Sequence, residues 1–376
     1  MANYIFGTGP FAKEVVKRLN SFNISTDGYL KLGDPTKSTE DTIYVDNSTT
    51  IDRNSTIFIT KKAIIMGETI DFLRRNNFRN IYVFDEELLT EESKTKEELF
   101  SYTRKIDLEK PFINYLEINV VDQCNLNCKG CAHFSNICNN NMLDIDKYST
   151  DLDKIAKHFD VYYFRLLGGE PLLHPRLKEI VELTRQKLPN TKLIIVTNGL
   201  LLDRLSIETL QTLAKCNVTF SISLYEPTSK KLDSIIEILN QYNIKYLIND
   251  DYTKSPEVIK SFYKSIATTK EENDSYKQCI GRFCRFLRDG KISKCYYPLL
   301  IEILNEKYGT SFQVTEDDYI ELDNITDGWE AIDKLNGKTP FCDYCRQTQE
   351  FFDWEPHHKN EKQLDSFVLQ KTINKN

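Results

Sequence analysis

Residues 115–131 read YLEINVVDQCNLNCKGC, an apolar run followed at once by Cys124, Cys128 and Cys131. The apolar half has the length and the β-branched residues that are typical of a buried strand. The cysteines form a C-x3-C-x2-C loop, a spacing that scattered packing cysteines do not produce. This stretch therefore predicts a strand that leads directly into a metal-binding loop.

Strand-like and helix-like segments alternate from Pro111 onward. Apolar strands are predicted at Tyr115–Val121, Val161–Leu167, Leu193–Thr197, Val218–Leu224 and Tyr246–Ile248. Between them, apolar residues recur at helical spacing, as at Leu177, Ile180 and Val181. Strands that alternate with helices indicate βα units on a parallel sheet. The loops at the C-terminal edge of such a sheet are where ligands bind.

Three further loops fall at this predicted edge. Gly168-Gly169-Glu170-Pro171 follows the second strand, Asn198-Gly199 the third, and Tyr225-Glu226 the fourth. Glycines allow the backbone to approach a ligand closely, which a Cβ would obstruct. We therefore expect these loops to converge with the cysteine loop on one rim.

Nine of the ten cysteines of this 376-residue chain fall into two groups, and Cys216 stands alone between them. The late group contains Cys279, Cys284, Cys295, Cys342 and Cys345. Thiols grouped in this way, at a density far below that of a disulfide scaffold, predict two metal-type sites in a reducing compartment. A hairpin is predicted beside the late group at Arg288-Asp289-Gly290.

The cysteine loop after the first strand of a βα series resembles the radical S-adenosylmethionine (SAM) superfamily. The resemblance implies that Cys124, Cys128 and Cys131 hold a [4Fe-4S] cluster whose open iron binds SAM. A zinc site completed by a distant ligand such as His133 is the alternative for the same thiols.

The resemblance also implies SAM-binding residues in the later loops. Gly168-Gly169-Glu170 is similar to the turn whose backbone holds the SAM amino group, with Glu170 as the charged partner. Asn198 is expected near the ribose and carboxylate of SAM, and Ser223 near its ribose and adenine. The plainer interpretation is that these are ordinary turn residues.

One position departs from the family pattern. The family commonly has an aromatic residue immediately before the third cysteine, and Gly130 stands there in this chain. We expect His133 or Phe134 to supply the aromatic contact to the adenine instead.

The late cysteines resemble the twitch domain, a shortened relative of the SPASM domain that holds one auxiliary iron–sulfur cluster. The shared features are the C-x10-G-x4-C spacing and a distant C-x2-C pair. The resemblance implies an auxiliary [4Fe-4S] cluster on Cys279, Cys295, Cys342 and Cys345. Cys284 is left out because it falls within the predicted hairpin strand. A structural zinc knuckle is the alternative.

The fold class expected is α/β, with a partial (β/α)6 TIM-like barrel at its centre. We expect five segments: a small Rossmann-like domain at 1–90, a linker at 91–110, the radical SAM barrel at 111–269, the twitch-like module at 270–350 and a tail at 351–376. In the first segment, Gly7-x-Gly9 between a strand and a helix suits a phosphate-binding turn, but the segment is too short for a full dinucleotide fold.

Composition narrows the partners and the compartment. Lys and Arg number 49 against 56 Asp and Glu, and the net charge of −7 argues against nucleic acid as the main partner. No apolar run approaches the roughly 18 residues of a membrane span. The start of the chain lacks the pattern of a signal peptide, which predicts a cytoplasmic protein.

The family resemblance implies a reaction class. An external one-electron reductant of the flavodoxin or ferredoxin type would drive cleavage of SAM to a 5′-deoxyadenosyl radical, which abstracts a substrate hydrogen. The segment Lys294–Arg346 looks most like radical SAM proteins of bacterial surface-glycan synthesis. We therefore expect a sugar or nucleotide sugar to be oxidised, dehydrated or epimerised. A peptide-modifying maturase and a non-catalytic, zinc-bound scaffold for glycan assembly are the alternatives.

Overall fold

The computed structural model describes residues 2–60, 66–89, 92–250, 257–279, 284–356 and 363–369. The chain divides into two compact units, one reaching Asn114 and the other beginning at Tyr115. Residues 91–110 were expected to form a linker, but they belong to the first unit, because they include its helix α3 and strand β6. Residues 90 and 91, at the expected boundary, lie outside the described residues.

The first unit is a sheet of six strands in the order β3-β2-β1-β4-β5-β6. The first five strands run parallel and β6 is antiparallel to β5. Its elements are β1 (Asn3–Phe6), α1 (Pro10–Ser21), β2 (Gly28–Leu32), β3 (Thr42–Val45), β4 (Thr56–Ile59), α2 (Met66–Arg75), β5 (Asn80–Phe84), α3 (Lys96–Ser101) and β6 (Thr103–Lys105). With β1 between β2 and β4, this order agrees with the expected Rossmann-like arrangement.

The second unit is built on a sheet of eight strands in the order β11-β10-β9-β8-β7-β13-β14-β15. The five strands predicted from the apolar runs are present within a few residues of their expected bounds. They are β7 (Phe112–Val121), β8 (Asp160–Gly168), β9 (Lys192–Thr197), β10 (Thr219–Ile222) and β11 (Lys245–Ile248). In β7 and β8 the side chains are buried on both faces, as a covered parallel sheet requires. The order ends at β11 and β15, so the sheet is open.

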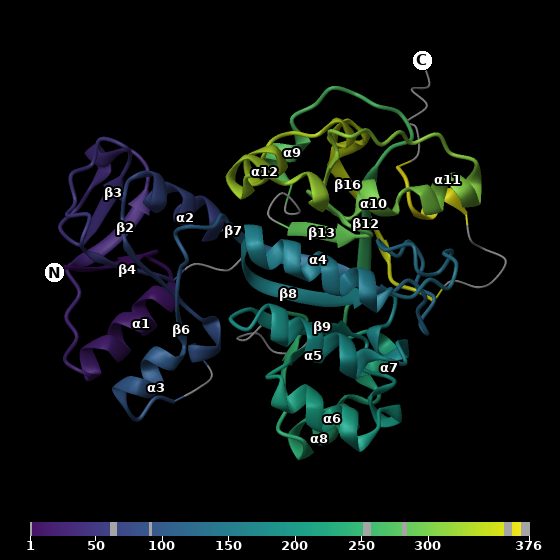
Figure 1. The fold of residues 1–376 in the computed structure, drawn as a ribbon, viewed down its shortest axis with the longest axis horizontal. Coiled ribbons are helices and arrows are strands. Elements are labelled where there is room, and N and C mark those ends of the chain that lie inside the picture. The colour runs from purple at the N-terminus through teal and green to yellow at the C-terminus, as the bar shows by residue number, and fades with distance from the viewer. Residues whose placement is uncertain are drawn as a thin grey trace. The chain divides into compact units, whose positions relative to one another are not determined.

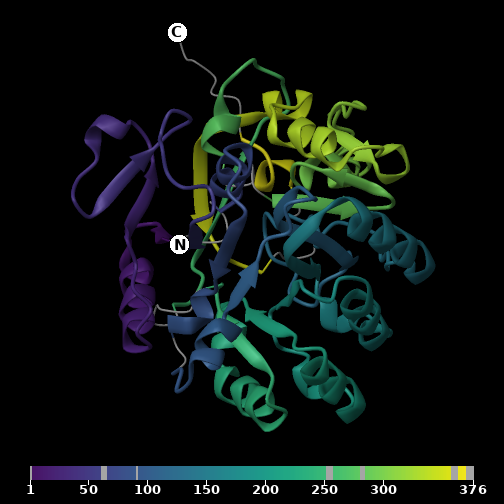
Figure 2. The same cartoon turned by 60° about the vertical axis from the view of Figure 1, so that its left-hand side comes forward.

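Helices follow the parallel strands and lie along one side of the sheet (Figures 1 and 2). They are α4 (Ile145–His158), α5 (Leu177–Lys187), α6 (Ile207–Lys215) and α8 (Leu232–Gln241). Each has an apolar stripe at helical spacing; in α5 the buried residues are Leu177, Ile180, Val181 and Thr184. None of the described helices is long and apolar enough to cross a membrane.

The predicted hairpin is confirmed. Strand β13 (Cys284–Arg288) pairs with β14 (Lys291–Ser293), and Asp289 and Gly290 between them have φ of +50° and +78°. Two positive φ values in a two-residue turn match the twist of a β-hairpin. Strand β13 also pairs in parallel with β7. Residues of the expected module at 270–350 thus extend the main sheet.

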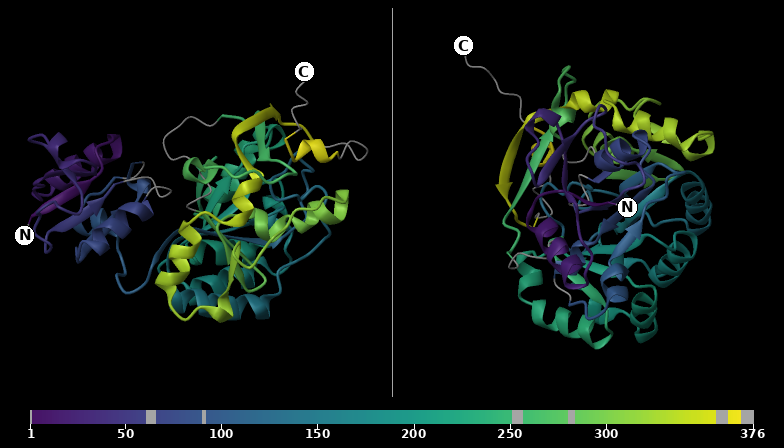
Figure 3. Two further views of the ribbon diagram at one scale, coloured as in Figure 1. Left: turned by 90° about the horizontal axis from the view of Figure 1, so that it is seen from above. Right: turned by 90° about the vertical axis from the view of Figure 1, so that its left-hand side faces the viewer.

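The chain beyond this hairpin returns to the same unit. It forms α10 (Tyr297–Leu300), α11 (Glu302–Tyr308), β15 (Tyr319–Glu321), α12 (Gly328–Asn336) and β16 (Cys345–Asp353), while α7 (Glu226–Ser229), β12 (Ser261–Ile266) and α9 (Ser275–Gln278) precede it. Strand β16 lies antiparallel beside β12 (Figure 3).

The segment expected to be a tail from 351 begins inside β16. Further on, Phe367 and Val368 are buried in the core with Phe286 and Phe341. Burial of these apolar side chains holds the segment in the fold, although no hydrophobic periodicity in the sequence predicted it. Residues 357–362 and 370–376 lie outside the described part of the chain.

Candidate cofactor site

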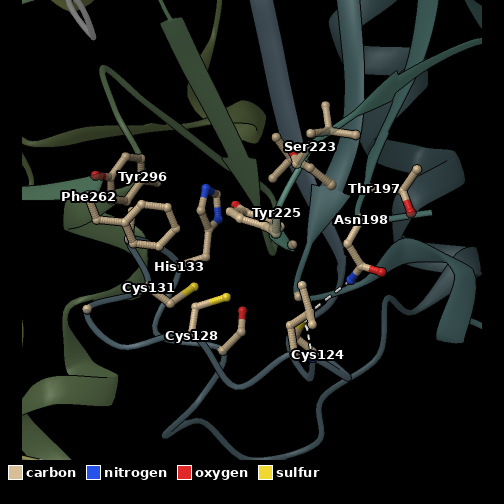
Figure 4. Close-up of a pocket in the computed structure, with 18 of the residues that line it drawn as sticks. Cys124, Cys128, Cys131, His133, Thr197, Asn198, Ser223, Tyr225, Phe262 and Tyr296 are labelled. Atoms are coloured by element: carbon tan, nitrogen blue, oxygen red, sulfur yellow. Dashed lines mark hydrogen bonds between the residues drawn. The ribbon is translucent and has the colours of Figure 1, made fainter. Parts of the chain in front are cut away.

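A cavity of about 350 Å³ lies where β7, β8, β9 and β10 end. Its lining joins the cysteine loop to the three loops that the strand order predicted beside it (Figure 4). The predicted site residues that line it are Cys124, Cys128, Cys131, Gly168, Gly169, Asn198 and Ser223. The expected convergence of these loops is therefore present in the structure.

Two of the three sulfurs in the cysteine loop accept hydrogen bonds from N–H groups. Leu126 N lies 3.4 Å from Cys124 Sγ, and the indole Nε1 of Trp354 lies 3.2 Å from Cys128 Sγ. Burial raises the pKa of Cys128 to about 12, and the charge of Cys131 adds to this rise. N–H donors are the partners that a metal-bound thiolate needs in a site from which water is excluded.

The three thiols of this loop are candidate ligands of an iron–sulfur cluster. Among the described residues, no three His, Cys, Asp or Glu groups converge on one point that would hold a single metal ion. A cubane cluster does not require that convergence, because its ligands sit on different irons.

Gly168 and Gly169 join the turn after β8 to the backbone that enters the cysteine loop. Gly169 N donates to Val121 O at 2.8 Å, and a Cβ on Gly169 would lie 1.9 Å from Gln123 O. Gly168 has φ of +130°, and its Cβ would lie 2.3 Å from Val121 O. The sequence suggested that a ligand requires these glycines, whereas the closest approach in the structure is to the chain's own backbone.

Glu170 does not line the cavity, in contrast to its expected role as the charged partner of SAM. The side chain is fully buried and accepts bonds from Thr197 Oγ1 at 2.5 Å, Asn198 N at 2.9 Å and Leu172 N at 3.1 Å. Burial raises the pKa of this carboxyl to about 7, against the opposing effect of these bonds. Glu170 therefore fixes the turn after β9 against the turn after β8.

Asn198 and Ser223 occupy the cavity wall as expected. Asn198 Nδ2 donates to Asn125 Oδ1 at 2.7 Å and lies 3.9 Å from Cys124 Sγ, which links the third loop to the cysteine loop. Ser223 is held by its own N–H, which donates to Thr197 O at 2.8 Å.

Phe134 does not reach the cavity, although it was one of the two aromatics expected there. It is 1% exposed and packs against Tyr297 and Phe367 in the core. The other, His133, does line the cavity. Its ring stacks on Tyr296 at 4.9 Å, and burial lowers its pKa to about 4.

Other aromatic residues of the cavity had no motif to mark them. Phe262 and Tyr263 come from β12. Tyr225 comes from a loop that precedes β12 in the sequence, and Tyr296 from a loop that follows it. Tyr225 belongs to the loop that is expected at this rim after the fourth predicted strand. The pairing of β12 with β16 could not be read from the sequence, because 78 residues separate Ile266 from Cys345.

Cys295 lies within electrostatic reach of three other late cysteines. The pKa of Cys295 is raised by burial and by the charges of Cys345, Cys279 and Cys342. Burial, the charge of Glu117 on the neighbouring strand β7, and the charge of Cys279 raise the pKa of Cys284 to about 12. The position of Cys284 at the start of β13 agrees with the expectation that it sits within the hairpin.

Residues 118–249 match the Radical SAM superfamily. This part of the chain is thus a radical SAM domain, a class whose members use a [4Fe-4S] cluster and SAM. The expected radical SAM domain, inferred from the cysteine spacing, is confirmed over these residues.

Named relatives match over the same part of the chain. A GTP 3',8-cyclase of Microcystis aeruginosa is 32% identical over 128 residues, 33% of this chain and 38% of that protein. A GTP 3',8-cyclase of Rippkaea orientalis is 34% identical over 145 residues, 37% of this chain and 39% of that protein. The chain thus spans about two fifths of the length of these relatives. The crystal structure of BtrN in complex with AdoMet and 2-DOIA is 17% identical, covers 64% of this chain and 96% of that one, and has a TM-score of 0.39.

Proposed function

We propose that Cys124, Cys128 and Cys131 hold a [4Fe-4S] cluster and that SAM binds beside it in the 350 Å³ cavity. The observation that carries this proposal is the convergence of the three cysteines with the glycine turn, Asn198 and Ser223 on one cavity. When bound, this pair of cofactors supplies a 5′-deoxyadenosyl radical that abstracts a hydrogen atom from the substrate.

The chain's own residues orient SAM and keep water out. The turn at Gly168 and Gly169 offers backbone groups to the amino group of SAM, and Asn198 and Ser223 offer polar side chains to its ribose and carboxylate. Phe262, which also lines the cavity, provides an apolar surface for the adenine ring. Glu170 acts behind this wall by holding Asn198 N at 2.9 Å.

A second [4Fe-4S] cluster is proposed on Cys279, Cys295, Cys342 and Cys345. Support comes from the mutual electrostatic influence of these four thiols. The charges of Cys342 and Cys295 also favour the protonated form of the buried Lys294 amine, opposing the lowering of its pKa by burial. A buried cation beside the thiols suits the negative charge of a four-thiolate cluster.

The proposed substrate is a sugar or nucleotide sugar that is oxidised, dehydrated or epimerised. The support is the resemblance of the segment Lys294–Arg346 to radical SAM proteins of surface-glycan synthesis. The name GTP 3',8-cyclase says that these relatives act on a nucleotide. This favours a nucleotide sugar over a free sugar as the substrate of this chain.

Iron counting on anaerobically purified and reconstituted protein tests the cofactor proposal. We expect about eight irons per chain, falling to about four in Cys124→Ala and in Cys295→Ala. Cys216→Ala is the matched control, because Cys216 is buried at a helix end away from both groups and should leave the count unchanged. Stoichiometric zinc without iron would support the scaffold alternative and refute the proposal.

Deuterium transfer tests the substrate class. Label that moves from a deuterated nucleotide sugar into 5′-deoxyadenosine, in the presence of SAM and a flavodoxin-type reductant, supports the proposal. Label that moves only from a peptide encoded beside this gene would refute it in favour of a peptide maturase.

A further inference from the structure

The segment 352–356 crosses the cysteine loop in the second unit. Lys129 N donates to Glu355 O at 3.0 Å, the Lys129 ammonium pairs with the Glu355 carboxylate, and Cys128 forms an isolated β-bridge with Pro356. In the middle of the segment, Trp354 N donates to Lys260 O at 2.8 Å. We call residues 352–356 the strap, and these contacts fix it across the loop.

The strap brings an indole N–H to a cluster cysteine. Nε1 of Trp354 lies 3.2 Å from Cys128 Sγ, well within the distance of an N–H···S bond. The Trp354 ring stacks on Tyr225 with centroids 5.3 Å apart and planes at 19°. Tyr225 in turn meets Phe262 edge-on at 5.9 Å. Aromatic contacts on its face therefore hold the indole in the orientation that the bond needs.

Gly130 makes room for this arrangement. Its φ is +60°, and a Cβ there would lie 2.4 Å from Phe352 Cζ and 2.6 Å from Ser366 O. An aromatic residue at this position, which is common in the family, would displace the strap. The absence of a side chain at Gly130 thus allows aromatic rings of the C-terminal segment to pack against the cysteine loop.

We infer that Trp354 is a positioning residue for the SAM-binding cluster, and that its N–H bond to Cys128 raises the cluster's reduction potential. The inference rests on the proposed function, because it needs a cluster on Cys128. Reduction adds negative charge to the cluster and its sulfurs, so an N–H donor stabilises the reduced form more than the oxidised form. Removal of the donor should make the cluster harder to reduce.

An EPR-monitored redox titration of the anaerobically reconstituted protein tests this inference. The SAM-binding cluster is assigned by the change in its signal when SAM is added. We expect Trp354→Phe to lower the equilibrium constant for one-electron reduction about tenfold, a shift of about 59 mV to more negative potential. Trp329→Phe is the matched control, since it changes the only other tryptophan and should leave the potential unchanged.

A variant that keeps the ring shape separates the bond from the packing. In the Trp329→Phe background, Trp354 is replaced by benzothienylalanine, in which sulfur stands in place of the indole N–H. The same negative shift with full iron content supports the inference, and an unchanged or more positive potential overturns it. Failure of the proposed function is distinguishable, because the unsubstituted protein would then bind no cluster at Cys128 and show no SAM-sensitive signal.

Discussion

The ion pair between Arg288 and Asp122 connects the hairpin to the entrance of the cysteine loop. Asp122 lies two residues before Cys124, and its side chain is 2% exposed. Arg288 Nη1 and Nη2 donate to the two carboxylate oxygens at 2.9 and 2.8 Å, and Asn119 adds a bond at 3.1 Å. Burial would raise the pKa of Asp122, but the hydrogen bonds and charge of Arg288 outweigh this effect and lower it.

We predict that Arg288→Met destabilises the apoprotein by about 3–5 kcal/mol at pH 7, because it leaves the Asp122 carboxylate buried without its cation. Urea unfolding followed by circular dichroism measures the loss. In the unsubstituted protein, the lowered pKa of Asp122 gives stability that is present above about pH 4 and is lost as the pH falls. In the variant the pKa rises, so the cost of the substitution should shrink between pH 7 and pH 5.

The matched control is Arg176→Met. Arg176 also holds a carboxylate with two nitrogens, at 2.7 and 2.6 Å from Glu179, but the two side chains are 57% and 49% exposed. A solvated pair of this kind contributes little to stability, so Arg176→Met should cause a much smaller loss. Adding Asp122→Asn to Arg288→Met should recover part of the loss by removing the buried charge. Equal losses in Arg288→Met and Arg176→Met, or no recovery in the double variant, would refute this reasoning.

Three further predictions follow from the turns and the C-terminal segment. Gly169→Ala should cost about 1–3 kcal/mol of unfolding free energy, because its Cβ meets backbone at 1.9 Å, while Gly9→Ala, with nothing within 4 Å, should show no such clash. Burial raises the pKa of the Glu170 carboxyl to about 7, so the apoprotein should lose up to about 3 kcal/mol of unfolding free energy as the pH rises from 4.5 to 7. Glu170→Gln should flatten this pH dependence in urea unfolding. An unchanged slope would contradict the assignment. Phe367→Ala should lower stability by about 3–5 kcal/mol, because the Phe367 ring is only 4% exposed. Phe351→Ala should lower it by less than about 0.5 kcal/mol, because the Phe351 ring is 64% exposed. Similar effects of the two variants in thermal unfolding would contradict burial of the C-terminal segment.

The features that depend on local pattern were predictable from the amino-acid sequence. The run Tyr115–Val121 predicted a buried strand because apolar and β-branched residues favour that state wherever the sheet lies. The same holds for the hairpin, since Asp289-Gly290 tolerates the positive φ of its turn. The cysteine loop was recognisable because Cys124, Cys128 and Cys131 lie close together in the chain with a spacing that scattered packing cysteines do not produce. Convergence of the loops followed from the rule that parallel strands end at a common edge.

Tertiary packing sets which side chains face the cavity and which lie behind its wall. Glu170 and Phe134 stand beside cavity residues in the chain, yet both are buried behind the wall, because side-chain direction depends on what packs against each turn. Trp354 lies 226 residues from Cys128 and belongs to a segment without periodicity, so no local signal connects them. That contact arises because β16 pairs with β12 and carries the strap to the cysteine loop. Pairing between distant segments is set by the burial and hydrogen bonding of the whole fold, which a local pattern does not encode.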